Sequence, residues 1–252
     1  MTNNLVIDFE QEIGKMETVE AGSFGKTMVV APHPDDETLG CGGTTAALLR
    51  QGFDVRFVFV SDGTMSHPNS KKYPKARLRS LREKEAVDAV KVLGGREEHI
   101  SFLALPDRDV PGQQSPYFES AVRLFISIIR SFEPETIFIP WQNDPHPDHR
   151  ASYQLVTEAV SRLDKKPLLM QYPIWFWEMG DNWDVELIRK MRISCVDISP
   201  TLAAKQNALL AHQSQITDLI DDDPEGFRLS PEVIAHFNRT REIFFENIND
   251  LT

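Results

Sequence analysis

Short apolar runs alternate with longer stretches of helical character along most of this chain. The apolar runs fall at residues 27–31, 55–60, 100–103, 136–140 and 168–172, and the helical stretches at residues 38–50, 75–93, 118–132 and 149–163. Strands that alternate with helices of this length form right-handed β-α-β units. The pattern therefore predicts a Rossmann-like α/β fold, with a mostly parallel sheet and helices on both faces.

Both ends of the chain depart from this alternation. Residues 1–25 are mixed and polar, so we expect an N-terminal arm packed on the main domain. A further strand at 192–198 and a helix at 200–213, with Ser199 as its candidate N-cap, precede a C-terminal helical extension expected at about 216–252. The length of 252 residues fits a single domain, 1–252.

A polar cluster at residues 33–37 directly follows the first apolar run. A strand that ends in this way delivers its polar side chains to the carboxyl edge of the sheet, where open α/β folds bind ligands. His33, Asp35 and Asp36 can hold a metal ion and leave one carboxylate free to accept a proton from water. The alternative is that the acidic residues only cap the helix that follows.

A second cluster, residues 144–149, follows the apolar run at 136–140 and precedes another helical stretch. The two clusters contain three of the seven histidines, His33, His146 and His149. Because the carboxyl ends of parallel strands share one edge of a sheet, the clusters can be neighbours in space. The pair of clusters therefore predicts a shared metal site and favours a hydrolase.

These two clusters also carry a family resemblance. Residues 31–37, Ala-Pro-His-Pro-Asp-Asp-Glu, and residues 146–149, His-Pro-Asp-His, resemble the paired motifs of the PIG-L (LmbE-like) family of zinc-dependent deacetylases. Pro32 departs from the usual opening of that motif without altering the candidate ligands. Residues 82–95, 105–107 and 205–215 resemble further family segments, so the resemblance spans about residues 28–215.

The resemblance implies a role for each polar residue of the two clusters. The implied zinc ligands are His33, Asp36 and His149. Asp35 is then the general base, and His146 stabilises the oxyanion or protonates the leaving amine, with Asp148 positioned to orient it. Two histidines and one carboxylate leave a coordination position open for catalysis, but the same set also suits Fe²⁺ or another divalent ion.

The resemblance further implies removal of an N-acyl group, most simply acetyl, from an N-acetylglucosamine-type sugar or glycoconjugate. Arg82 is expected to hold a substrate hydroxyl or anion rather than to lie exposed on its helix, and Asp107 either binds a sugar hydroxyl or shapes a turn. One alternative activity is an amidase acting on a thiol conjugate or another amide. Another is a non-catalytic, metal-bound binder of sugars or nucleotides.

Three other segments leave alternatives open. Gly40, Gly42 and Gly43 lie within a helix start, which favours close backbone approach over a nucleotide-binding loop. The aromatic segment 172–179 forms either a wall of the substrate pocket or a core or oligomer contact. The acidic run 221–226 is interpreted as a solvated loop, with calcium binding as the alternative. His212 is expected to pack and hydrogen-bond within its helix rather than to bind metal.

Composition and charge limit the binding partners and the cellular compartment that we expect for this protein. Twenty-seven Lys and Arg residues against 38 Asp and Glu give a net charge of −11, which argues against nucleic acid and anionic membranes. No run of about 18 apolar residues and no signal peptide are evident, and the two cysteines predict no disulfide framework. We expect a cytoplasmic enzyme with a small-molecule substrate. The family resemblance leaves a homo-oligomer open.

Overall fold

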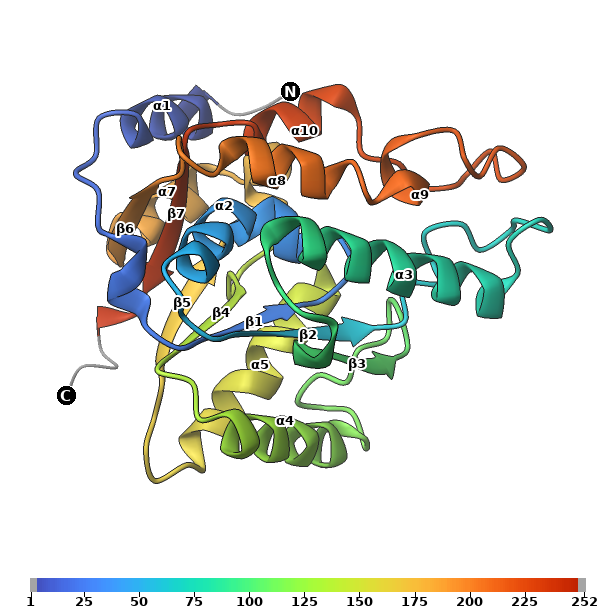
Figure 1. Cartoon of the computed structure of the whole chain (residues 1–252), viewed down its shortest axis with the longest axis horizontal. Helices are drawn as coiled ribbons and strands as arrows, with labels where there is room; N and C mark the ends of the chain where they lie inside the picture. The colour runs from blue at the N-terminus through green and yellow to red at the C-terminus, as the bar shows by residue number, and fades with distance from the viewer. Residues whose placement is uncertain (1–3, 249–252) are drawn as a thin grey trace.

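The computed structural model describes residues 4–248, which contain a seven-stranded sheet (Figure 1). The alternation predicts its parallel strands correctly: β1 Thr27–Ala31, β2 Val55–Ser61, β3 Ile100–Leu105, β4 Thr136–Pro140 and β5 Leu168–Tyr172. The strand order is β3-β2-β1-β4-β5-β7-β6, so successive strands are added in opposite directions from the β1/β4 pair. Such a switch point is where open α/β sheets bind ligands. The predicted Rossmann-like fold is confirmed.

Helices cover both faces of the sheet, as predicted (Figure 1). One face is covered by α2 Asp36–Arg50, α3 Lys75–Leu93 and α8 Leu202–Leu209, and the other by α4 Phe118–Phe132 and α5 Pro147–Ser161. The bounds of α3 and α4 agree with the sequence pattern. Helices α2 and α5 each begin two residues earlier than expected, so both polar clusters run into the first turn of a helix.

The C-terminal part differs from the expected helical extension. It contains the short helices α9 Gln213–Ile216 and α10 Pro231–Phe237. The expected helical extension is wrong at residues 241–246, which form the strand β7 Arg241–Glu246. This strand runs antiparallel between β5 and β6 Arg192–Asp197, because its buried apolar residues complete the core at that edge. The predicted N-cap of α8 is also wrong, since Thr201 occupies that position and the Ser199 hydroxyl donates to Asp197 instead.

The N-terminal arm is helical. Helix α1 Asn4–Ile13 packs against α7 Asn182–Ile188, and the 3₁₀ turn η1 Ala21–Phe24 leads into β1. A second 3₁₀ turn, η2 Glu97–His99, precedes β3, and α6 Phe176–Met179 follows β5. Among residues 4–248, no helix has the length and apolar character needed to cross a membrane. Both cysteines, Cys41 and Cys195, are buried and free.

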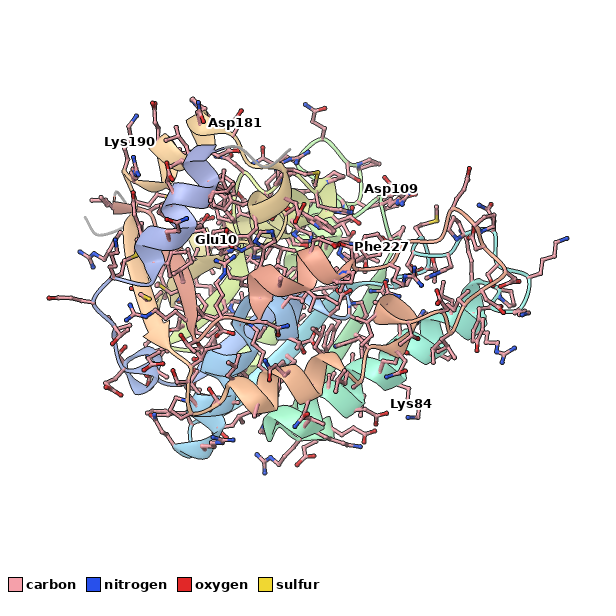
Figure 2. All side chains as sticks on the ribbon, turned by 90° about the horizontal axis from the view of Figure 1, so that it is seen from above. Glu10, Lys84, Asp109, Asp181, Lys190 and Phe227 are labelled. Carbon is pink, nitrogen blue, oxygen red and sulfur yellow. The ribbon has the colours of Figure 1, made fainter. Side chains whose placement is uncertain are left out.

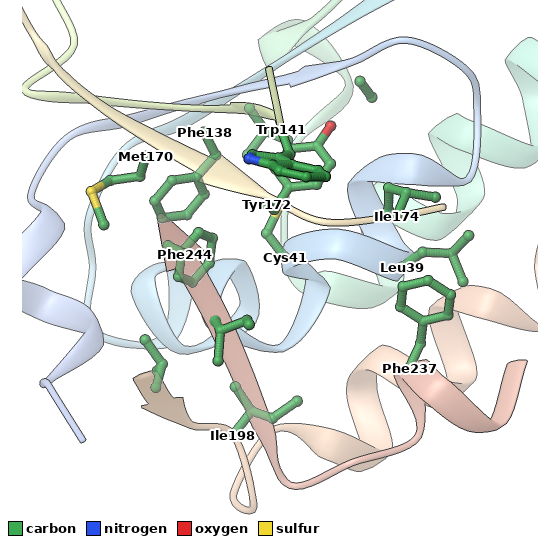
Figure 3. Close-up of a cluster of buried hydrophobic side chains, with 14 of the residues drawn as sticks. Leu39, Cys41, Phe138, Trp141, Met170, Tyr172, Ile174, Ile198, Phe237 and Phe244 are labelled. Atoms are coloured by element: carbon green, nitrogen blue, oxygen red, sulfur yellow. The ribbon is translucent and has the colours of Figure 1, made fainter. Parts of the chain in front are cut away.

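The helix that carries the first cluster packs closely against Tyr172 of β5 and Ile198. Tyr172 lies in the buried cluster of Figure 3, and its hydroxyl donates to the carbonyl of Val30 at 2.6 Å. A Cβ atom at Gly40 would lie 2.2 Å from the Tyr172 ring, and one at Gly43 would lie 2.5 Å from Ile198. The glycines therefore permit close backbone approach, as interpreted from the sequence.

A buried ion pair supports the same helix where its regular geometry is interrupted. Helix α2 has non-helical dihedral angles at Cys41. Just beyond this kink, the carboxylate of Glu242 on β7 accepts the backbone N–H groups of Gly43 and Thr44 at 2.9 and 2.7 Å. Lys205 on α8 donates to the same carboxylate at 2.7 Å. The C-terminal strand thus compensates for the hydrogen bonds that the kink disrupts.

Candidate functional site

The two polar clusters meet at the carboxyl ends of β1 and β4, the switch point of the sheet. The ring centroid of His33 lies 4.7 Å from that of His146 and 5.4 Å from that of His149. One ring nitrogen from each of these three histidines lies within 4.8 Å of the others. Parts of the chain more than a hundred residues apart therefore form one imidazole cluster.

Asp36 links two of these imidazoles. Its Oδ2 atom lies 3.2 Å from Nδ1 of His33 and 3.3 Å from Nε2 of His149. Burial alone raises the pKa of Asp36, but the charges and hydrogen bonds of His149 and His33 outweigh burial and hold the pKa well below its usual range. Burial lowers the pKa of His149, yet Asp36 and Asp144 raise it to about 9. The carboxylate of Asp36 is therefore ionised at neutral pH.

The donor set of these three residues fits a divalent transition metal. His149 is fully buried, and neither of its ring nitrogens has a well-aligned hydrogen bond within residues 4–248. Its Nδ1 atom lies 3.2 Å from the Asp144 carboxylate, which leaves Nε2 facing Asp36 and His33. A carboxylate behind a ligating histidine is the usual support of such sites. Asp144 belongs to the second cluster, but the sequence alone did not assign it this supporting position.

Asp35 lies beside this set in a strained conformation. Its φ of 134° and ψ of −31° are rarely adopted by a residue with a side chain. The Glu37 carboxylate accepts the Asp35 backbone N–H at 2.9 Å, and the opposite oxygen of Glu37 lies 2.9 Å from Nε2 of the buried His212. Burial raises the pKa of Asp35 to about 7, although the Arg82 guanidinium opposes this shift. Such a pKa suits a general base at neutral pH.

His212 is buried and hydrogen-bonded, but the expectation of a partner within its own helix is wrong, because Glu37 of the first cluster is the partner. Glu37 therefore joins the first cluster to the C-terminal segment.

His146 and Asp148 are connected in a different way from the one the sequence suggested. His146 is the N-cap of α5, and its Nδ1 atom accepts the backbone N–H of Asp148 at 3.2 Å. The Asp148 carboxylate instead lies 3.2 Å from Nε2 of His33 and accepts the backbone N–H of Arg108 at 2.7 Å. The loop after β3 draws the carboxylate away because it presents N–H donors there. Burial and the positive charges of His33 and His149 lower the pKa of His146 to about 4.

Arg82 reaches the site from α3 and is only 3% exposed, so it is not a surface residue of its helix. Its guanidinium donates to the carbonyls of Gly63 and Pro34 at 3.0 and 2.7 Å and lies 3.4 Å from Asp35. Asp107 accepts the backbone N–H of Met65 at 2.7 Å, and its other oxygen lies 3.3 Å from Nε2 of His33. Arg82 and Asp107 both organise the loops around the first cluster.

These groups line one cavity with a polar base and an apolar wall. The base is formed by His33, Asp35, Asp36 and His146, with Arg82, Asp107 and Arg108 beside them. The wall includes Met65, Ile174, Trp175, Phe227 and Leu229. Figure 2 shows Phe227 in the segment between α9 and α10, which no sequence motif had linked to the site.

The aromatic segment after β5 serves both of the roles considered for it. Trp175 lines the cavity and meets the Phe227 ring edge-on at 5.8 Å between centroids. Trp177 is instead buried, and its ring stacks on Phe9 of α1 at 6.4 Å.

The acidic run also has a role that the sequence did not indicate. Asp222 accepts the backbone N–H groups of Lys71 and Lys72, each at 2.8 Å, and the Ser70 hydroxyl at 2.6 Å. The expected solvated loop is therefore a clamp between the segment before α3 and the segment that carries Phe227.

Comparisons with known proteins identify the family of this chain. A family model described as PIG-L, GlcNAc-PI de-N-acetylase, matches residues 28–160. The chain is 31% identical to diacetylchitobiose deacetylase of Thermococcus kodakarensis, over 77% of this chain and 71% of that protein. It is 29% identical to a Mycobacterium 1D-myo-inositol 2-acetamido-2-deoxy-alpha-D-glucopyranoside deacetylase, over 76% of this chain and 74% of that protein.

The fold has a close counterpart among solved structures. The N,N'-diacetylchitobiose deacetylase of Pyrococcus horikoshii superposes with a TM-score of 0.68, covering 94% of this chain and 90% of that one at 24% identity. At that level of identity the likeness concerns the fold alone.

Proposed function

Because this chain belongs to the PIG-L family of de-N-acetylases, we propose that it hydrolyses the N-acetyl group of an N-acetylglucosamine-type sugar or glycoconjugate. The products are acetate and the free amine. The observation that carries this proposal is the convergence of His33, Asp36 and His149, with a further carboxylate, Asp35, beside them. A binding site alone requires no such additional base.

In this proposal His33, Asp36 and His149 hold the metal. Zn²⁺ is favoured over Fe²⁺ because hydrolysis involves no redox change, although the ligand set suits both ions. When bound, the metal supplies Lewis-acid polarisation of the amide carbonyl. The carboxylates of Asp144 and Asp148 hold the outer ring nitrogens of His149 and His33, which fixes the orientation of both imidazoles.

The remaining groups move protons and stabilise charge. Asp35 accepts a proton from the attacking water, which its raised pKa of about 7 favours. His146 faces the cavity from the opposite loop. Its lowered pKa of about 4 keeps the imidazole neutral at neutral pH, and Nδ1 accepts the Asp148 N–H, so the ring can donate from Nε2 to the oxyanion. One preorganised donor of this kind contributes about 10²- to 10³-fold in rate. Arg82 holds the Asp35 loop through the Pro34 carbonyl and lines the cavity where the sugar would bind.

Asp35→Asn and Asp36→Asn form a matched pair of variants that tests these roles. We expect Asp35→Asn to retain the metal and to lose about 10²- to 10⁴-fold in kcat, because only proton transfer is removed. Asp36→Asn should lose the metal itself, because a ligating charge is removed. Metal content and acetate release are measured on both proteins. An Asp35→Asn protein that purifies without metal, or that keeps wild-type kcat, would contradict the assignment.

The reaction class is tested with the metal-loaded wild-type protein. Acetate release is followed on N-acetylglucosamine, diacetylchitobiose and a glucosaminyl conjugate, and on an amide of a thiol conjugate as the non-sugar alternative. We expect release from the amino sugars, loss of that activity with a chelator and recovery with Zn²⁺. Release that persists without metal would refute the mechanism, and turnover of the thiol conjugate alone would favour the amidase.

A further inference from the structure

Arg108 is a charged residue of the cavity lining that has no role in the proposed reaction. It lies in the loop after β3, and its side chain is exposed at the cavity. Within residues 4–248, the Arg108 guanidinium has no hydrogen-bond acceptor and no carboxylate at ion-pair distance. The other arginine of the cavity, Arg82, is buried and donates to two backbone carbonyls. Arg108 thus presents a free cationic group where substrate would bind.

The backbone of Arg108 is held in an unfavourable conformation. Its φ of 64° is left-handed, a conformation that costs a residue with a side chain about 1 kcal/mol. The Arg108 N–H donates to Asp148 Oδ2 at 2.7 Å, and the same oxygen lies 3.2 Å from Nε2 of His33. Such conformations persist where surrounding contacts fix them. The position of Arg108 is therefore fixed relative to a candidate metal ligand.

The polar base of the cavity carries both signs of charge, with Arg82 and Arg108 beside three aspartates, and its wall is apolar. Its wall includes the side chains of Met65, Trp175, Phe227 and Leu229, none of which carries a charge. The chain as a whole has a net charge of −11, which disfavours the approach of an anion. A guanidinium offers a planar pair of donors that matches a carboxylate or a phosphate. An unpaired arginine inside the cavity therefore provides a local site for an anionic group.

We propose that Arg108 forms a subsite for an anionic substituent, a carboxylate or a phosphate, carried by the amino sugar. This inference rests on the proposed deacetylase function and narrows its substrate class to acidic amino-sugar conjugates. The acetamido group lies at the polar base of the cavity, and the anionic group meets the Arg108 guanidinium at its open side.

The experiment compares neutral and anionic substrates on the metal-loaded protein. The probes are N-acetylglucosamine, its 1-phosphate and 6-phosphate, and an N-acetylglucosaminide with a carboxylate aglycone. The measured quantity is the ratio of kcat/KM for each anionic substrate to that for the neutral sugar. Arg108→Gln removes the charge, and Arg108→Lys keeps the charge but removes the planar fork. Arg123→Gln is the matched control, because it removes the same charge from the exposed face of α4.

For at least one anionic substrate, we expect the wild-type kcat/KM to be about 10- to 100-fold higher than for the neutral sugar. This range is typical of hydrogen bonds to charged groups. Arg108→Gln should abolish this preference through KM, Arg108→Lys should retain part of it, and Arg123→Gln should leave the ratio unchanged. The preference should also weaken at high salt. A wild-type ratio near one for every anion, or an equal loss for neutral and anionic sugars in Arg108→Gln, would overturn the subsite.

Binding measured by calorimetry on the same sugars separates the two proposals. If the protein binds anionic sugars more tightly than the neutral one and Arg108→Gln abolishes the difference, the subsite holds even where no acetate is released. In that case only the deacetylase proposal fails. If acetate is released without any anionic preference in binding or turnover, the subsite is refuted and the deacetylase proposal remains.

Discussion

The buried pair of Glu37 and His212 should support both the stability and the catalysis of this protein. Neither side chain is exposed, and Nε2 of His212 lies 2.9 Å from Glu37 Oε1. Burial lowers the pKa of His212, but Glu37 outweighs burial and raises it overall. Replacing His212 by Ala leaves the Glu37 carboxylate with only neutral donors, the Thr38 hydroxyl and the Asp35 N–H.

The magnitude follows from the burial of that charge. Breaking a buried ion pair by removing one partner costs about 3–5 kcal/mol. In a protein of this size each kcal/mol lowers Tm by about 2–4 °C, so His212→Ala should melt roughly 6–20 °C below wild type. Because Glu37 also holds the strained backbone of Asp35, kcat should fall by about 10- to 100-fold at the permissive temperature.

Thermal unfolding of the metal-free protein and acetate release by the metal-loaded protein are the two assays. His236→Ala is a matched control. Like His212, His236 is paired with carboxylates, in its case Glu10 and Glu178, but it lies outside the cavity. Its loss of Tm should be smaller, with kcat retained. In a Glu37→Gln background, His212→Ala should lower Tm much less than in wild type.

The pH dependence gives a further check on the same pair. A histidine whose folded-state pKa is raised contributes its full stabilisation below its unfolded pKa of about 6.5 and loses it as pH rises through the folded value. The difference in stability between wild type and His212→Ala should therefore be greatest near pH 6 and shrink at alkaline pH. A Tm within 2 °C of wild type, or an equal loss in both Glu37 backgrounds, would refute the reasoning.

Two other contacts of the C-terminal part lead to predictions of their own. Asp222→Ala removes the acceptor of three hydrogen bonds worth about 1 kcal/mol each. The loop before α3 should therefore be cleaved faster by protease. The KM for substrate should also rise, because these hydrogen bonds position the segment that carries Phe227. Lys205→Met leaves the Glu242 carboxylate buried and unpaired and should lower the free energy of unfolding by about 3–5 kcal/mol. Chemical denaturation should show that adding Glu242→Gln recovers part of that loss, and a double variant less stable than Lys205→Met would contradict this account.

The chemical centre of the site is predictable because its information is local. An apolar run of five residues forms a strand, and the polar residues that follow it must lie at the carboxyl edge of the sheet. Two such runs, ending at Ala31 and Pro140, are enough to bring His33 and His149 to one edge. The sequence does not reveal the strain at Asp35, because that conformation depends on Glu37 and on the distant His212.

The choice of partner made by Asp148 illustrates what the sequence pattern leaves open. Its neighbour in the motif is His146, and a carboxylate next to an imidazole in sequence suggests that the two interact. The loop after β3 presents the N–H of Arg108 to this carboxylate, which then lies against His33 instead. That outcome depends on a left-handed residue in another loop, and no periodicity or motif of the second cluster encodes it.

Long-range contacts of this kind determine which substrate fits the cavity more than they determine the catalytic chemistry. The base of the cavity comes from two motifs, whereas its wall joins Met65, Trp175 and Phe227 from three separate connections. Asp222 and the bond from the Phe227 N–H to the Ser66 carbonyl fix two of those connections to each other. Because these contacts cross 150 residues of sequence, a change in either loop can alter the wall while both motifs stay intact. Relatives that share the motifs can therefore share the reaction and differ in the sugar that they accept.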